Sequence, residues 1–455
     1  MHRRILFPTV LLCITVTVGA NTINGNLQQV VDVKDKNFVC NTEFSPNEST
    51  VPMGTILKQP VKVQILDIEN YPLEYTNIHF ISDYPRLATV SDVIKGIELD
   101  SDHKWQGNIT IDLRFMGKAH IRTELVNTLT NNTKSCGNKL KLTIIRQQRI
   151  IDYVFTGSVA LLVSLLYIIF GAALDLTILR NLLRRPVGPA IGFLSQFLLM
   201  PLLSYGIGYL IFPNSVDMQL GLFFTGVSPS GGASNMWSVI LGGNINLSIL
   251  MTTLSNFAAF GMMPLWIFTL GSLIFARGNM HVPYKNITIF AVSLIVPLAI
   301  GLAIQKFSPR ITRVLMRLLK PASSCLILFI VIFAIITNLY LFELFSWQIV
   351  LGGLLLPWLG YILAWLLAKM LHQNAVDSLT IAIETGIQNT GIAIFLLRFS
   401  LPPPQDDLTT VIPVSVAIMT PFPLLGIYLY KKFAVRRFKD NLSDEVSSSI
   451  RDASG

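Results

Sequence analysis

Nine apolar stretches follow one another between residues 153 and 430, and most are near the length of a membrane-spanning helix. About 20 helical residues cross the roughly 30 Å of hydrocarbon in a bilayer. Charged residues make up only 13% of the chain, against about 25% in soluble domains. We therefore predict an all-α polytopic membrane domain over residues 151–432, with spans at 153–174, 187–212, 219–241, 246–275, 286–304, 322–342, 346–371, 378–397 and 409–430.

The first 20 residues have the organisation of a secretory signal peptide. A basic start precedes the apolar run 6–18, and small residues follow it. An uncleaved first membrane helix is the alternative, but this run is too short to span a bilayer and contains Pro8. Cleavage after residues 1–20 would leave residues 21–150 as an exported segment.

Residues 21–150 alternate polar and apolar side chains in several short segments, which Pro, Gly and Asn clusters separate. A period of two is expected of strands that bury one face. We predict a small extracellular β domain, an antiparallel sandwich, with strands near 61–68, 75–82, 108–115 and 139–145.

Export would expose this domain to disulfide formation and glycosylation. Of the four cysteines, one leaves with the signal peptide and Cys325 lies in an apolar run, so we predict a disulfide between Cys40 and Cys136. Three Asn-X-Ser/Thr sequons in the same segment are predicted glycosylation sites, at Asn47, Asn108 and Asn131.

The basic residues around the nine spans predict their orientation. An extracellular N-terminal domain and an odd number of spans put the tail, residues 433–455, in the cytosol. On this assignment fifteen Lys and Arg residues are cytosolic and three are outside, as the positive-inside rule requires. The signal peptide, the exported segment and the membrane part together account for the net charge of +9. No positive charge is left over for a nucleic-acid partner, so none is expected. The plasma membrane is the predicted location.

Glu384 is the ionisable residue that lies deepest in a predicted span, as the seventh residue of the span 378–397. A charge at mid-bilayer costs between about 2.5 and more than about 10 kcal/mol, so such residues usually serve a function. Gln388 and two glycines follow it closely. A carboxylic acid kept neutral, or bonded to a neighbouring helix for stability alone, is the alternative.

Pro229, Gly231 and Gly232 interrupt the third span near its middle. Non-helical backbone survives at membrane depth only where it is buried in protein or lines a cavity. A loop between two short helices is the alternative, but the flanking runs are too short to cross separately. A second break lies near residue 386, just after Glu384. Two interrupted spans in separate halves indicate a secondary transporter with inverted repeats. Oxygen donors suited to a hard monovalent cation accompany the breaks, namely Glu384, Asn235, Gln388, Ser234, Ser248 and Thr252.

Motifs at these positions resemble the sodium/bile acid cotransporter family over roughly residues 155–430. They lie at 195–201, 229–235, 244–253, 261–265 and 383–389. The large N-terminal segment makes the chain look most like orphan members that carry such a domain. The resemblance implies about nine spans with inverted repeats, two broken crossing helices, a core domain that rocks against a panel domain, and two sodium sites without an organic cofactor.

The resemblance also implies a function, the sodium-coupled secondary active symport of an amphipathic organic anion of the bile acid or sulfated steroid class. One sodium ion would be held by Ser234, Asn235, Ser248, Thr252 and Glu384. The other would be held by Gln196, Glu384, Gln388 and the backbone carbonyls of Thr385 and Ile387, with Asn389 as a substrate contact.

The first break departs from the family pattern, which usually reads Pro-Gly-Gly-Thr-Ala-Ser-Asn. Here Ser230 replaces the first Gly and Gly232 replaces the Thr. Both precede the ligands, so we expect intact ion sites and an altered substrate cavity. The alternative function is a non-transporting receptor or scaffold that binds a partner through its ectodomain. An enzyme is least favoured, because the sequence has no zinc cluster, phosphate-binding loop or Ser/His/Asp set.

Overall fold

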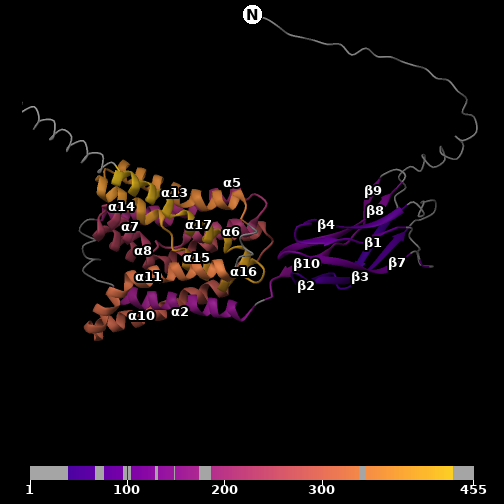
Figure 1. The fold of residues 1–455 in the computed structure, drawn as a ribbon, viewed down its shortest axis with the longest axis horizontal. Helices are drawn as coiled ribbons and strands as arrows, with labels where there is room; N and C mark the ends of the chain where they lie inside the picture. The colour runs from indigo at the N-terminus through magenta and orange to yellow at the C-terminus, as the bar shows by residue number, and fades with distance from the viewer. Residues whose placement is uncertain are drawn as a thin grey trace, which may run out of the picture. The chain divides into compact units, whose positions relative to one another are not determined.

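The computed structural model describes residues 39–66, 76–95, 100, 104–128, 132–147, 149–173, 186–337 and 345–433. The chain forms two compact units, Met1–Ile145 and Arg146–Gly455 (Figure 1). The predicted signal peptide, Asn131 and all but the first residue of the predicted tail lie outside the described residues.

The first unit is a β domain of two sheets, which confirms the prediction of an N-terminal β-rich domain. One sheet has the order β1 (Val39–Phe44), β3 (Ile56–Leu66), β7 (Lys104–Leu113) and β5 (Ala88–Val90). The other has the order β2 (Glu48–Pro52), β10 (Leu140–Ile145), β8 (Gly117–Asn127), β4 (Thr76–Ser82) and β6 (Val93–Ile94), with β9 (Thr133–Ser135) against β8. The predicted antiparallel pairing holds for the other strand pairs, whereas β2 and β10 pair in parallel.

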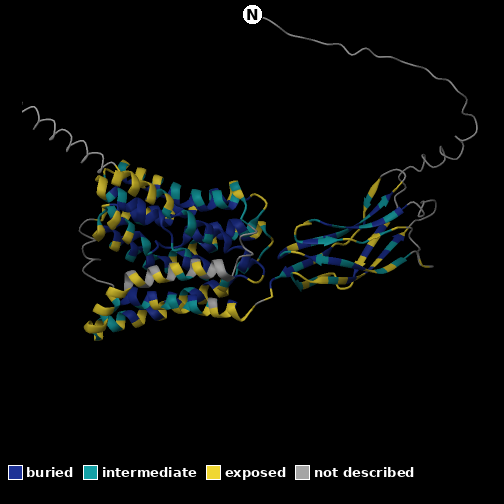
Figure 2. Cartoon of the chain, viewed as in Figure 1, coloured by how far each residue is buried: buried dark blue, intermediate teal, exposed yellow. Residues whose placement is uncertain are grey.

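Alternation along each strand builds the core of this domain, as the bands of buried and exposed residues in Figure 2 show. Ile109 and Ile111 on β7 and Ile121 on β8 are fully buried. Thr110, which separates the two isoleucines on β7, is partly exposed. Two predicted glycosylation sites, Asn47 and Asn108, are exposed. Both side chains are therefore accessible to a modifying enzyme.

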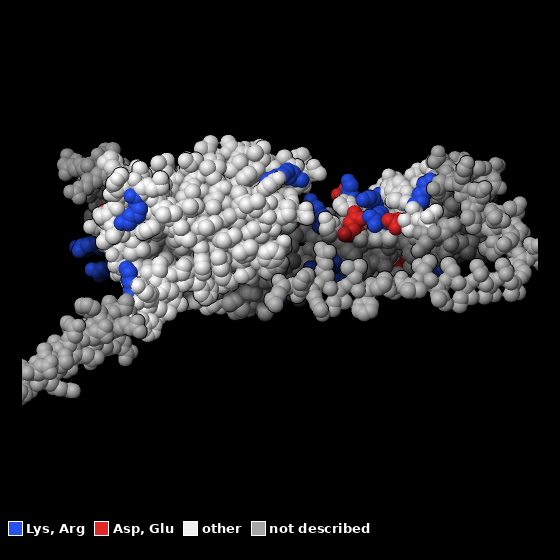
Figure 3. All heavy atoms as spheres, turned by 90° about the horizontal axis from the view of Figure 1, so that it is seen from above, with Lys and Arg blue, Asp and Glu red and all other residues white. Residues whose placement is uncertain are grey.

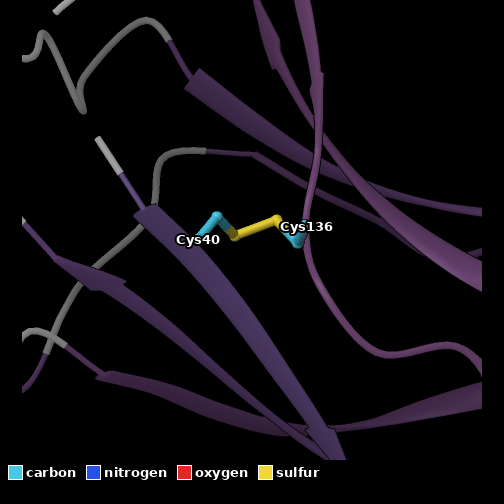
Figure 4. Close-up of a disulfide and its surroundings, with 2 residues drawn as sticks. All are labelled: Cys40 and Cys136. Carbon is cyan, nitrogen blue, oxygen red and sulfur yellow. A yellow bond between two sulfur atoms is a disulfide. The ribbon is translucent and has the colours of Figure 1, made fainter. Parts of the chain in front are cut away.

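Cys40 on β1 and Cys136, directly after β9, form a disulfide with their Cα atoms 4.7 Å apart (Figure 4). The bond closes a loop with a sequence separation of 96 residues. A cross-link over such a long loop restricts the unfolded chain strongly.

Replacing both cysteines by alanine is expected to lower the free energy of unfolding of the β domain by about 2–5 kcal/mol. Urea unfolding of the full chain in detergent measures this loss. Protease cleavage of the β domain at each urea concentration reports how much of it is unfolded. Cys325→Ala is the matched control, because Cys325 is an exposed free cysteine on another unit. Equal stability of the double variant and this control would contradict the prediction.

The second unit is helical, and its elements contain the two predicted breaks. The first elements are α2 (Ile150–Ala173), α4 (Val187–Leu194), η2 (Ser195–Leu199), α5 (Met200–Ile211), α6 (Val216–Val227) and α7 (Ala233–Ile240), and the first break separates α6 from α7. Then come α8 (Ile245–Trp266), η3 (Ile267–Gly271), α9 (Ser272–Arg277), α10 (Tyr284–Phe307), α11 (Pro309–Thr337) and α13 (Trp347–Met370). The second break separates α14 (Ala375–Gly386) from α15 (Thr390–Ser400), and α16 (Gln405–Leu408) and α17 (Val411–Met419) follow.

Six helical segments among the described residues are long and apolar enough to cross a membrane. They are Ile150–Ala172, Val187–Ile211, Ile245–Arg277, Tyr284–Phe307, Trp347–Met370 and Gln405–Phe433. The prediction of apolar membrane helices is confirmed, whereas the count of nine is not. Two of the remaining predicted spans are the interrupted pairs, whose separate helices have only 8 to 12 residues. Figure 3 shows the face of the helical unit in view with charged side chains only near its ends.

The two breaks lie against each other inside the helical unit. Ser230 and Gln388 form an antiparallel bridge. On either side of it, the Gly231 N–H donates to the Ile387 carbonyl at 2.8 Å, and the Asn389 N–H donates to the Pro229 carbonyl at 2.8 Å. Backbone groups that the helices leave unpaired are thus satisfied by the opposite break, as burial away from water requires.

Glycine makes this close approach possible. A Cβ atom on Gly231 would lie 2.9 Å from the Gln388 carbonyl oxygen, and one on Gly386 would lie 2.2 Å from the Tyr361 ring. Elsewhere in the unit, α2 packs against both α10 and α11. The backbones of α2 and α10 meet at Gly171 and Gly301, as small residues permit in membrane helices.

Candidate cation site at the helix crossing

The carboxylate of Glu384 lies beside the crossing, on the last turn of α14, and only 1% of the residue is exposed. Three hydroxyl groups donate to it. Thr252 Oγ1 is 2.7 Å and Ser230 Oγ is 2.8 Å from Oε2, while Ser248 Oγ donates to Oε1. The donors come from α8 and from the break between α6 and α7, so two segments besides α14 itself fix the position of the carboxylate.

Two polar residues on α7 extend this cluster. Asn235 Oδ1 lies 2.8 Å from Ser248 Oγ, and the Asn235 amide nitrogen donates to Thr252 Oγ1 at 3.2 Å. Ser234 Oγ lies 3.5 Å from Thr252 Oγ1. The structure therefore brings together all five residues of the first predicted sodium set. Their carboxylate, amide and hydroxyl oxygens are ligands that hard cations prefer.

The local structure explains how these side chains converge. Ser248 and Thr252 are four residues apart on α8 and share one face of that helix. The side chain of Asn244 caps the start of α8 by accepting from the Asn246 and Leu247 N–H groups. On α7, Ser234 and Asn235 follow directly after the break, so their positions depend on the crossing.

The second predicted set lies around Gln196 and Gln388. Gln196 belongs to η2, a π-helical turn of the kind that occurs at functional sites. Its Nε2 donates to the Ser228 carbonyl at 2.7 Å and to Gln388 Oε1 at 2.9 Å, and Gln388 Nε2 donates to the Thr385 carbonyl at 2.6 Å. The Ile387 carbonyl, the remaining predicted ligand, accepts the Gly231 N–H across the crossing.

Asn389, the predicted substrate contact, is half-buried and begins α15. Its Oδ1 accepts the Ile392 N–H at 3.2 Å as a helix cap. Asn389 is therefore a structural element of the crossing, whatever else it contacts.

Ser230, which precedes the predicted ligands and belongs to neither predicted set, also contacts the Glu384 carboxylate through its hydroxyl. Ser238 and Ser255 also belong to this cluster, although neither is a predicted ligand. Ser248 Oγ lies 3.2 Å from Ser238 Oγ, and Ser255 Oγ accepts the Ser230 N–H at 2.9 Å. A signal was available for Ser255, which lies seven residues after Ser248 on the same face of α8.

A separate cluster of four charged side chains lies where α2 begins. Arg146 contacts both carboxylate oxygens of Asp152, at 2.9 and 3.0 Å, and Asp407 at 3.2 Å. Arg398 contacts the same Asp407 at 2.9 Å. All four side chains are at most 10% exposed. Two positive and two negative charges thus join α2 to α15 and α16.

Comparisons with known proteins give related descriptions. Residues 153–343 match the model of the Sodium Bile acid symporter family. The chain is 31% identical to human P3 protein over 57% of this chain and 54% of that protein. It is 30% identical to the ileal sodium/bile acid cotransporter of Cricetulus griseus (62% and 82%) and 34% identical to the sodium-dependent organic anion transporter of Mus musculus (54% and 65%). The chain spans about half the length of the P3 proteins that it matches.

Proposed function

Because this chain belongs to the sodium bile acid symporter family, we propose that it carries an organic anion across a membrane together with sodium ions. The family is one of symporters and not of enzymes. Inward movement of sodium would supply the free energy of its concentration gradient. The membrane potential would add about 2.3 kcal/mol per charge for each 100 mV.

The observation that carries the proposal is the surroundings of the Glu384 carboxylate. It is buried beside two broken helices, and its neighbours are hydroxyl and amide groups. One cation is held by the Ser234, Asn235, Ser248, Thr252 and Glu384 set. A second is held by Gln196, Glu384 and Gln388 with the Thr385 and Ile387 carbonyls.

The charge of these two sites favours an anionic substrate. Two sodium ions on one carboxylate leave a net positive charge, which a negatively charged substrate can offset. Two relatives are named as transporters, one of bile acids and one of organic anions. Their names support a substrate that is an amphipathic anion of the bile acid or sulfated steroid class. Asn389 begins α15 next to the cation ligands and is the proposed substrate contact.

The proposed transport motion separates two groups of helices. The helices α2, α10 and α11 pack together and form the panel domain. The elements that supply the ion ligands, namely η2, α7, α8 and α14, belong to the core domain with α15. Rocking of the panel against the core exposes the crossing to one side of the membrane and then to the other.

We place the chain in the plasma membrane, with the glycosylated β domain outside and the C-terminus in the cytosol. The exposure of Asn47 and Asn108 supports this orientation, because glycosylation requires accessible sequons. The fifteen-to-three distribution of basic residues supports it independently.

Uptake of labelled bile acids and steroid sulfates by cells that express the full chain tests the function. We expect uptake of at least one of these anions in sodium chloride and none above background in choline chloride. Surface biotinylation in both media controls for expression. Equal uptake in the two media would contradict sodium coupling, and silence across the panel by a protein at the surface would favour the receptor alternative.

A further inference from the structure

The predicted ligand sets omit one hydroxyl group that lies at the carboxylate. Ser230 belongs to the break between α6 and α7, and only 2% of the residue is exposed. It lines a pocket together with Gln196, Glu384 and Ser255. The pocket therefore contains members of the second proposed sodium set and one oxygen that has no assigned role.

The geometry of the Ser230 hydroxyl suits a cation ligand. Its Oγ lies 2.8 Å from Glu384 Oε2 and 2.8 Å from the Glu384 backbone oxygen. A hydroxyl has a single hydrogen, so it donates to one of these acceptors at a time. When the hydrogen points to the backbone oxygen, Oγ and Oε2 face each other as two oxygens. A cation bound by both of them removes that repulsion.

An unpartnered acceptor in the same pocket points independently to a ligand. Gln196 Oε1 is buried, has no hydrogen-bond partner among the described residues, and belongs to a residue that is only 4% exposed. Gln388 Nε2 donates to the Thr385 carbonyl, which leaves its Oε1 as an acceptor for Gln196 Nε2. The Gln196 amide cannot be turned over without placing its oxygen against two acceptors. A buried oxygen held without a partner requires an explanation, and a bound cation provides one.

We propose that Ser230 Oγ binds the second cation together with Gln196 Oε1 and Glu384 Oε2. The proposal rests on the sodium-coupled function and extends it to a residue that departs from the family pattern. Ser230 is suited to this role because its backbone is fixed without its side chain. Its N–H donates to Ser255 Oγ, and the break pairs with Gln388.

The same contacts predict that removal of the hydroxyl alters ion binding more than it alters the fold. In Ser230→Ala, the sodium concentration that gives the same rise of the melting temperature as in the unaltered protein is expected to increase about tenfold, as loss of one contact to a charged group implies. Ser230→Gly should give the same shift, because glycine also lacks the oxygen. Ser415→Ala is the matched control, since Ser415 is a buried serine that bonds the Ile349 carbonyl on α13.

The measurement is thermal unfolding of the purified full chain in detergent, with sodium chloride exchanged for choline chloride at constant ionic strength. A ligand of the folded state stabilises it by RT ln(1 + [L]/Kd), so the melting temperature rises once the sodium concentration exceeds the dissociation constant. Each variant is compared with its own melting temperature in choline, so a general loss of stability does not imitate the effect. Sodium-dependent uptake in cells gives a half-saturating sodium concentration for each variant as a second measure.

Three outcomes separate the two proposals. A tenfold shift in both Ser230 variants and none in Ser415→Ala supports Ser230 as a ligand. An unshifted sodium response in both Ser230 variants overturns that assignment while the sodium-coupled function stands. Absence of any sodium response in the unaltered protein, in unfolding and in uptake alike, overturns both.

Discussion

Replacing Glu384 by alanine or glutamine is expected to abolish sodium-dependent uptake while the protein still reaches the cell surface. The carboxylate is the negative charge that both proposed cations share. Removing one partner of a buried charge pair costs about 3–5 kcal/mol, which lowers affinity by about two to four orders of magnitude. The three hydroxyl groups that now donate to the carboxylate remain in Glu384→Gln, so that variant removes the charge with little change of shape.

Labelled-anion uptake at saturating sodium, normalised to the biotinylated surface protein, measures the effect. Asp377→Asn is the matched control, because Asp377 lies seven residues earlier on α14 and bonds Asn244 and Asn374 instead of the site. This control should keep sodium-dependent uptake. Unchanged uptake in either Glu384 variant would refute the assignment of the site.

Replacing Arg146 by alanine is expected to destabilise the helical unit by about 3–5 kcal/mol. The guanidinium contacts Asp152 and Asp407, so its loss leaves two buried carboxylates without this partner. Such a group costs far more than an exposed ion pair, for which the contribution is about 0–1 kcal/mol. Urea unfolding of the full chain in detergent, followed by proteolysis of the helical unit, measures the change.

Arg114→Ala supplies the comparison, because Arg114 pairs with Asp112 at 3.0 Å and both side chains are at least half exposed. Its effect should stay below about 1 kcal/mol. If the two arginine variants lost equal stability, the buried cluster would not contribute as proposed. The test is independent of transport, so it does not depend on the identity of the substrate.

The sequence predicted those parts of the fold that depend on local periodicity. The strand expected near 139–145 is β10 at Leu140–Ile145, because alternation marks its buried face directly. The parallel pairing of β10 with β2 was missed, because alternation says nothing of which strand lies alongside. Pro229 likewise located the first break, since proline cannot continue a helix, but the number of spans depended on apolar length alone.

The candidate site shows the same division between local and distant information. Spacing placed Ser248 and Thr252 on one helix face, and the family resemblance suggested their partners. The contact of Ser230 with Glu384 joins residues 154 positions apart and depends on the register of the crossing. The bond between Arg146 and Asp407 spans 261 positions. Neither contact has a sequence pattern, because nothing local fixes which residues meet.

Gly171 and Gly301 bring the backbones of α2 and α10 into contact, so these two helices would move as one body in the proposed transport motion. Added Cβ atoms would lie only 2.3 and 2.1 Å from backbone oxygens of the opposite helix, so the two helices interlock and resist sliding. The distance between spin labels on α2 and α10 should therefore stay constant throughout the proposed transport cycle. The distance between labels on α2 and α8 should change in each cycle. A larger residue at either glycine would disturb this helix contact and impair the proposed motion without contacting an ion or a substrate.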